Sequence, residues 1–86
     1  MAQSNKFHYN LIFHPELEGG FTVLVPSLPG CISYGRTLEE ARKNIIDAVG
    51  GYVESLRKHK EPIPNDEKSF FTSLDFEINY PYAAAA

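Results

Sequence analysis

One long amphipathic helix, predicted for residues 38–59, is the feature that most limits how this chain can fold. Thr37 and Glu40 have the spacing of a capping box, in which a hydroxyl and a carboxylate each accept a backbone N–H at the start of a helix. Apolar residues then recur every three or four positions, on one helical face: Leu38, Ala41, Ile45, Ala48 or Val49, Tyr52 or Val53, and Leu56. A single helix covers only one face of a sheet, so the opposite face is expected to be solvated or used for association.

Two adjacent glycines, Gly50 and Gly51, lie inside this predicted helix. Together they destabilise it by about 1–2 kcal/mol relative to alanines. Close packing of the helix on a sheet or on another chain would explain them, and a break in the helix is the alternative.

Four segments around the helix have strand patterns. Residues 7–13 and 70–78 alternate apolar and polar side chains, while 21–25 and 31–35 are short runs rich in β-forming residues. The short link at 14–20, with one proline and two glycines, predicts an antiparallel hairpin. The predicted class is therefore α+β in the order β-β-β-α-β, a small and mainly antiparallel sheet with one long helix on one face. The fourth strand, 70–78, is expected at an edge.

The length of 86 residues fits one small domain, which we assign to residues 5–80, with tails at 1–4 and 81–86. Such a domain has a thin core, so self-association is a natural supplement. The first ten residues contain no apolar signal region, and no stretch approaches ~18 consecutive apolar residues. We therefore expect no membrane span and a cytoplasmic location. The single cysteine, Cys31, excludes an intrachain disulfide and fits a reducing compartment.

The net charge of −3 is concentrated near the end of the chain. From residue 61 onward, Lys68 is the only basic residue against five acidic ones: Glu61, Asp66, Glu67, Asp75 and Glu77. Nucleic-acid-binding domains usually carry a basic surplus, so this charge argues against that class. A basic partner is one interpretation, and a solvated charged surface is the other.

No arrangement of residues predicts a catalytic, cofactor or metal site. A two-metal nuclease centre needs converging carboxylates, and residues 6–14 contain none. Three other acids belong to the outward helix face or the polar strand face: Asp47, Glu54 and Asp75. His8 and His14 are six residues apart, about 20 Å along a strand, which is too far to share a metal ion. We interpret Cys31 as a small buried side chain and the glycines as turn residues.

The turns and the helix start together resemble the HicB-like antitoxin domain. The likeness spans about residues 6–64 and is carried by residues 18–23 (EGGFTV), 25–31 (VPSLPGC), 33–35 (SYG) and 37–41 (TLEEA). The resemblance implies a partial ribonuclease-H-like fold. It also implies a partner, because in type II toxin–antitoxin pairs of this family the HicB-like protein binds and silences a small HicA-type toxin. That toxin is a basic, messenger-RNA-cleaving protein with a fold like that of double-stranded-RNA-binding domains.

Many members of that family carry a further C-terminal ribbon-helix-helix or helix-turn-helix domain that binds operator DNA. Here only 22 residues follow Pro64, and they have the pattern of a link, a strand and a tail. No helical pair is left to enter a major groove. The chain therefore resembles a short form without a DNA-binding domain, and direct DNA binding is not expected.

The leading hypothesis is an antitoxin-like protein-binding domain, not an enzyme, that neutralises a HicA-type toxin by occlusion. It needs no cofactor and is expected to self-associate as a dimer or tetramer, through the fourth strand or the uncovered sheet face. The candidate residues for partner binding or self-association are Tyr34, Arg36, Phe71, Asp75, Glu77 and Tyr80. For Phe71, burial in the chain's own core is an alternative of at least equal weight. Two other functions stay open: an orphan HicB-like oligomeric scaffold or ligand-binding domain without a toxin, and a degenerate nuclease.

Overall fold

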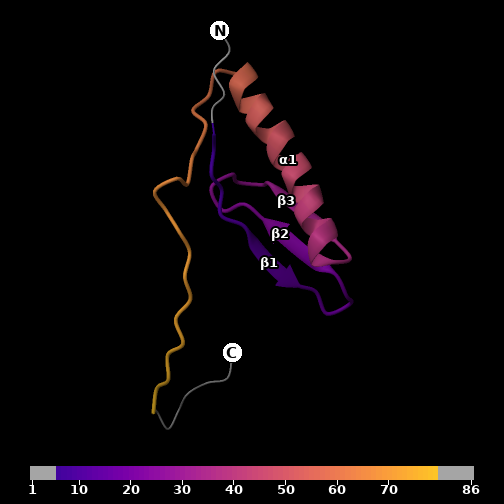
Figure 1. Ribbon diagram of the computed structural model, residues 1–86, viewed down its shortest axis with the longest axis vertical. Coiled ribbons are helices and arrows are strands. Elements are labelled where there is room, and N and C mark those ends of the chain that lie inside the picture. The colour runs from indigo at the N-terminus through magenta and orange to yellow at the C-terminus, as the bar shows by residue number, and fades with distance from the viewer. Residues whose placement is uncertain (1–5, 80–86) are drawn as a thin grey trace.

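The computed structural model describes residues 6–79, in which three strands precede one helix (Figure 1). β1 (Ile12–Pro15), β2 (Phe21–Leu24) and β3 (Ile32–Gly35) form an antiparallel sheet in the order β1-β2-β3. α1 (Leu38–Lys58) lies along one face of this sheet and packs mainly on β3 and β2. The predicted α+β class, with one long helix on one face, is confirmed. Within residues 6–79, no helix has the length and apolar character needed to cross a membrane.

The helix forms where the sequence pattern places it. Thr37 is the N-cap, and its hydroxyl accepts the backbone N–H of Glu40 at 3.0 Å, which is one half of the predicted capping box. α1 continues without a break through Gly50 and Gly51. Both glycines are exposed, and a Cβ built on either would meet nothing within 4 Å. Packing on the chain's own sheet therefore does not explain them, and close approach of another chain stays a prediction.

The strand register separates two rows of side chains. Phe13, Val23 and Ser33 are cross-strand partners on the face that α1 covers. Ile12, Leu24 and Ile32 are partners in the next row, which points to the opposite face because side chains alternate along a strand. The predicted hairpin of the first two strands is confirmed.

β1 is shorter than the strand predicted for residues 7–13. Its partner β2 ends at Leu24, which pairs with Ile12. Beyond that point the N–H of Val25 bonds to the carbonyl of Cys31 at 3.1 Å, and Pro26 turns the chain away. Residues before Ile12 therefore have no neighbouring strand on that side. Two of them, Tyr9 and Leu11, still pack against the core in line with Phe13 of β1, as the alternation predicts.

The core is small, and half of its buried residues lie in the loop between β2 and β3. Its buried members are Val23, Val25, Leu28, Cys31, Ala41 and Ile45. Leu28 lies in the loop between β2 and β3, yet it has no exposed surface. The loop is closed by hydrogen bonds from Leu28 N–H to Val25 O (3.0 Å) and from Cys31 N–H to Leu28 O (2.9 Å). Tyr52 of α1 donates its hydroxyl to Pro29 O at 2.8 Å, which fastens the loop to the helix.

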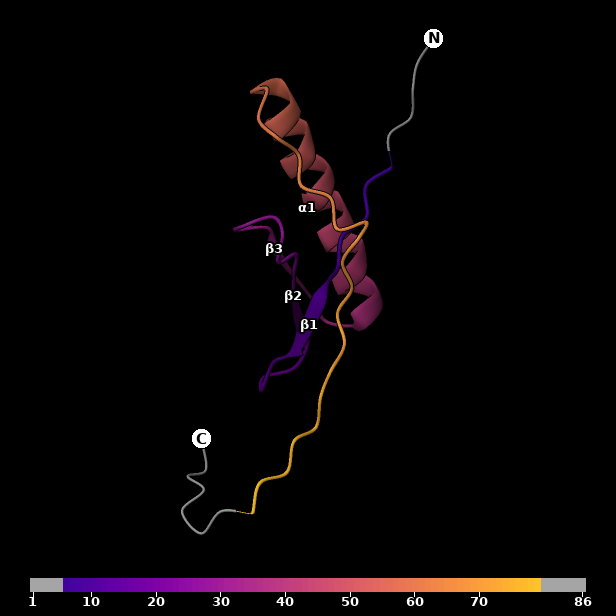
Figure 2. The same ribbon diagram turned by 90° about the vertical axis from the view of Figure 1, so that its left-hand side faces the viewer.

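The fourth strand predicted at 70–78 is wrong for this chain taken alone. Residues 70–79, here called the arm, are extended and exposed, and they belong to no sheet (Figures 1 and 2). A strand needs a hydrogen-bonding neighbour, and the arm runs clear of β1. Phe71 is 55% exposed, so its alternative interpretation as a core residue is also wrong. The ribonuclease-H-like character of the fold stays a prediction.

Candidate functional site

The predicted interaction residues fall into two separate groups. Tyr34 lies in β3, and Arg36 follows that strand directly; both are exposed. Phe71, Asp75 and Glu77 lie on the arm, away from the sheet (Figure 1). The predicted residue Tyr80 lies outside the described residues. The five described residues therefore do not form one surface, and the body and the arm have to be considered separately.

The body offers an uncovered sheet face with an apolar row across all three strands. Ile12 is 40% exposed and Ile32 is 58% exposed, and Leu24 is half-buried between them. The next row along the sheet consists of His14, Thr22 and Tyr34. We call these six residues the outer face. It has an apolar centre and a polar, aromatic border, which is the arrangement found in protein–protein interfaces.

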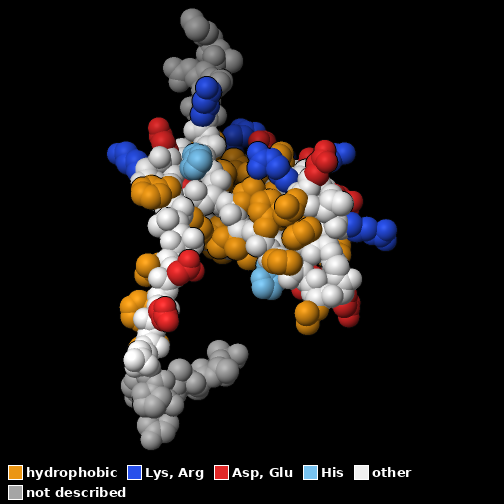
Figure 3. Space-filling view, turned by 60° about the horizontal axis from the view of Figure 1, so that its bottom comes forward, with side chains coloured by type: hydrophobic (Ala, Val, Ile, Leu, Met, Phe, Trp, Pro, Cys, Tyr) orange, Lys and Arg blue, Asp and Glu red, His pale blue; other side chains and the backbone are white. Residues whose placement is uncertain are grey.

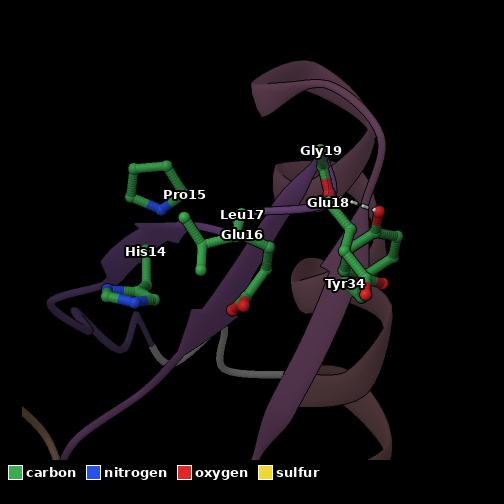
Figure 4. Close-up of a pocket in the computed structure, with 7 residues that line it drawn as sticks. All are labelled: His14, Pro15, Glu16, Leu17, Glu18, Gly19 and Tyr34. Carbon is green, nitrogen blue, oxygen red and sulfur yellow. Dashed lines mark hydrogen bonds between the residues drawn. The ribbon is translucent and has the colours of Figure 1, made fainter.

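A hollow of about 500 Å³ adjoins the outer face at the β1–β2 turn (Figure 4). His14 and Pro15 lie on one side of it, and Glu18 and Tyr34 lie on the other. Its remaining lining residues are Glu16, Leu17 and Gly19. All seven lining residues are exposed, so the hollow is too open to enclose a small ligand and suits a protruding side chain of a protein partner.

The shape of this hairpin hollow depends on Gly20 and Tyr34. Gly20 has a φ of +81°, and a Cβ there would lie 2.1 Å from the Tyr34 hydroxyl oxygen. The ring therefore lies directly over the glycine, and its hydroxyl donates to Gly19 O at 2.9 Å. On the other strand, Thr22 donates its hydroxyl to the Glu16 carboxylate at 2.7 Å. The hollow thus presents the two carboxylates of Glu16 and Glu18 from a held turn, and it attracts a cationic side chain.

At the base of the arm, Asp66 ties the C-terminal segment to the N-terminal one. Its N–H donates to His8 O at 2.7 Å, and its carboxylate accepts the N–H of Asn10 at 3.1 Å and the hydroxyl of Ser27. Its carbonyl accepts the N–H of Ser69 at 2.9 Å, which forms a turn. We call this set of contacts the Asp66 clamp. The sequence pattern predicted only an exposed polar link at this position.

The clamp holds the pKa of the Asp66 carboxyl below its usual range. The largest cause is the hydrogen bond from the Ser27 hydroxyl, followed by the bond from the Asn10 N–H. Partial burial opposes this shift, and the charge of a protonated His8 adds to it. Tyr9 is affected in the other direction, since burial and then the Asp66 carboxylate raise its pKa.

The clamp should make the stability of the protein depend on pH in the acidic range. Above the ordinary aspartate pKa of about 3.9, the carboxyl is ionised in both the folded and the unfolded chain, so the clamp contributes fully. As pH falls through the lowered folded-state pKa, the unfolded chain has bound the proton more readily and this contribution is lost. Urea unfolding is measured between neutral pH and pH ~3. The free energy of unfolding should fall more steeply with decreasing pH for the unmodified protein than for Asp66→Asn. Asp75→Asn is the matched control, and a wild-type slope in Asp66→Asn would contradict the role of the clamp.

The groups that could support other chemistry are dispersed or buried. Cys31 is a free, buried cysteine, as predicted, and burial raises the pKa of its thiol. A raised pKa lowers the thiolate fraction, so the side chain is a poor nucleophile. Among residues 6–79, no three His, Cys, Asp or Glu side chains come together to hold a metal ion. Glu54 pairs with Arg57 on the helix surface.

Comparison with known proteins agrees with a protein-binding role for these surfaces. A family model described as the HicB-like antitoxin of bacterial toxin–antitoxin systems matches residues 9–81. A UPF0150 protein of Thermoplasma acidophilum is 44% identical over 64 residues, which is 74% of this chain and 93% of that protein. A UPF0150 protein of Synechocystis is 39% identical over 61 residues, or 71% of this chain and 77% of that protein.

Proposed function

Because the chain belongs to the HicB-like antitoxin family, we propose that it neutralises a small, basic, RNA-cleaving toxin of the HicA type by covering the toxin's active surface. Family membership indicates a role in a toxin–antitoxin system. The identity of the toxin, the occlusion mechanism and action in the cytoplasm are parts of the proposal. In this mechanism the chain performs no chemistry, because blocking access of RNA to the toxin is sufficient.

The outer face with its adjoining hollow is the observation that carries the proposal. Ile12, Leu24 and Ile32 form an apolar centre that nothing in residues 6–79 covers, and burying such a centre gives most of the free energy of association. The hairpin hollow adds two carboxylates at the border, where they would meet lysine or arginine side chains of a basic toxin. Charges at the rim of an interface mainly accelerate and orient the encounter. Tyr34 belongs to both surfaces, and Arg36 lies beside it.

An RNA-cleavage assay tests this function directly. The purified chain is added to a basic toxin recovered with it from the native cell at low salt, and the cleavage of a messenger RNA is followed. Cleavage should stop at stoichiometric amounts of the chain. Ile32→Asp should weaken the inhibition at least about 10-fold, because it places a charge in the apolar centre.

The matched control is Leu38→Asp. Leu38 is 52% exposed, close to the 58% of Ile32, but it lies at the start of α1 and not on the outer face. An acidic residue is tolerated in the first turn of a helix, so this variant should fold and inhibit normally. Equal inhibition by both variants would contradict binding through the outer face. If no basic protein of toxin size is recovered, the alternative of an orphan HicB-like domain is favoured.

A further inference from the structure

The arm has the side-chain pattern of a strand that has a sheet on one side and solvent on the other. Phe70 is 82% exposed, Leu74 is 84% exposed and Phe76 is 78% exposed, and Ile78 continues the same face. The opposite face carries Ser73, Asp75 and Glu77 after Phe71. Figure 3 shows the hydrophobic side chains spaced along the arm with acidic ones between them. So much apolar surface on an open strand promotes aggregation unless another sheet receives it.

The arm leaves the body from a fixed position. The Asp66 clamp holds residue 66 beside His8 and Asn10, and the turn from Asp66 to Ser69 comes directly before the arm. From there the arm extends past the β1–β2 turn without touching the sheet (Figure 1). The base of the arm is therefore anchored, while its apolar face remains available to a partner.

The body has a matching open site beside β1. A hollow of about 210 Å³, here called the helix-edge hollow, lies between the segment before β1 and the middle of α1. It is lined by Tyr9, Leu11, Arg42, Ile45, Ile46 and Val49. Ile46 is 55% exposed there, although it belongs to the helix that forms the core. β1 is an outer strand of the sheet, so backbone groups along its free edge are also open to pairing within the described chain.

We propose that the arm of a second copy of this chain adds along the free edge of β1 and covers the helix-edge hollow, in a reciprocal exchange. The side chains of Phe70, Leu74 and Phe76 would then face α1, where the core is open. Asp75 and Glu77 would point to the outer side of the sheet, toward the side occupied by His14. The backbone hydrogen bonds and the alternate side-chain pockets are those of strand addition.

A second copy fits this site better than an unrelated partner because each chain carries both halves. One arm and one helix-edge hollow per chain allow a closed, two-fold symmetric dimer in which every arm fills the helix-edge hollow of the other chain. None of residues 70–79 lines the chain's own helix-edge hollow, which leaves that hollow for the partner. This exchange requires no toxin, so its test is independent of the proposed function.

The test uses the purified full chain and measures its mass in solution by analytical ultracentrifugation. The unmodified protein is expected to be a dimer. The double variant Leu74→Asp/Phe76→Asp should dimerise at least about 100-fold more weakly, because two anchor side chains become charged. Neither residue is part of the chain's own core, so circular dichroism should show an unchanged fold. Ser73→Asp, on the opposite face of the arm, is the matched control and should remain dimeric.

A mixing experiment shows whether arm and hollow meet. Ile46→Asp alters the hollow and should also give a monomer with an intact fold, since Ile46 is largely exposed. Mixed with Leu74→Asp/Phe76→Asp, it should form a heterodimer, because one chain supplies a working arm and the other a working hollow. A monomeric unmodified protein, a dimer that persists in the double variant, or two variants that do not combine would each overturn the proposal.

Discussion

Replacing Leu28 with alanine is expected to remove about 2–5 kcal/mol from the free energy of unfolding, because it opens a cavity in a core with few members. The side chain is completely buried although it comes from a loop. A domain of this length has a total stability of roughly 4–13 kcal/mol, so the variant should be close to unfolding at room temperature. Urea denaturation followed by far-ultraviolet circular dichroism would measure the change.

Leu17→Ala is the matched control for this prediction. Leu17 is also a loop leucine, in the β1–β2 turn, but its side chain is fully exposed. Its truncation buries or exposes no core surface and should change stability by less than about 0.5 kcal/mol. Similar effects of the two substitutions would mean that the Leu28 loop does not close the core.

Replacing Gly35 with alanine should be destabilising by about 1–3 kcal/mol or more, for the opposite reason, overpacking. A Cβ at this position would lie 2.1 Å from the backbone nitrogen of Ala41 and 2.6 Å from its Cα. These neighbours are backbone atoms of α1 and cannot rotate away. The first turns of the helix would have to move off β3, which would disturb the burial of Ala41.

Gly50→Ala makes the same chemical change in open surroundings. It lies inside α1, where a Cβ would meet nothing within 4 Å, so only helix propensity matters. The substitution should therefore stabilise the protein by up to about 1 kcal/mol. Thermal unfolding should thus move in opposite directions for the two glycine variants. A shift in the same direction would contradict the close approach of β3 and α1.

Local signals were sufficient to predict the helix and the strand–helix order. The spacing of apolar residues after Thr37 predicted a helix for 38–59, and α1 occupies Leu38–Lys58. The link of one proline and two glycines at 14–20 predicted the first hairpin, and the structure pairs β1 with β2. These features depend on near neighbours along the chain, through backbone dihedral preferences, capping and side-chain periodicity. For the same reason, the resemblance to HicB-like antitoxins could be identified from the turns and the helix start.

The candidate surfaces could be predicted only in part. Tyr34 was singled out from the sequence, but its neighbours in the hairpin hollow, Glu16 and Glu18, were not. They are distant from Tyr34 in sequence, and the strand register brings them to the same end of the sheet. Two further roles were not predicted from the sequence. Leu28, a turn residue, completes the core, and Asp66, a link residue, clamps the base of the arm. A leucine between two prolines was the only local signal for the first, and no local signal marked the second.

The arm shows most clearly the difference between what the sequence pattern predicts and what the tertiary structure decides. Its alternation of apolar and polar side chains is a property of the sequence, and it predicted a strand that the structure does not show. Whether a segment becomes a strand depends on a neighbour with free backbone N–H and C=O groups, which periodicity does not specify. The hydrogen bonds of Asp66 hold residue 66 beside His8 and Asn10, while residues 70–79 run clear of β1, so within the described chain they have no such neighbour. The sequence therefore has the pattern of a fourth strand, and the tertiary fold leaves residues 70–79 without a neighbour to pair with.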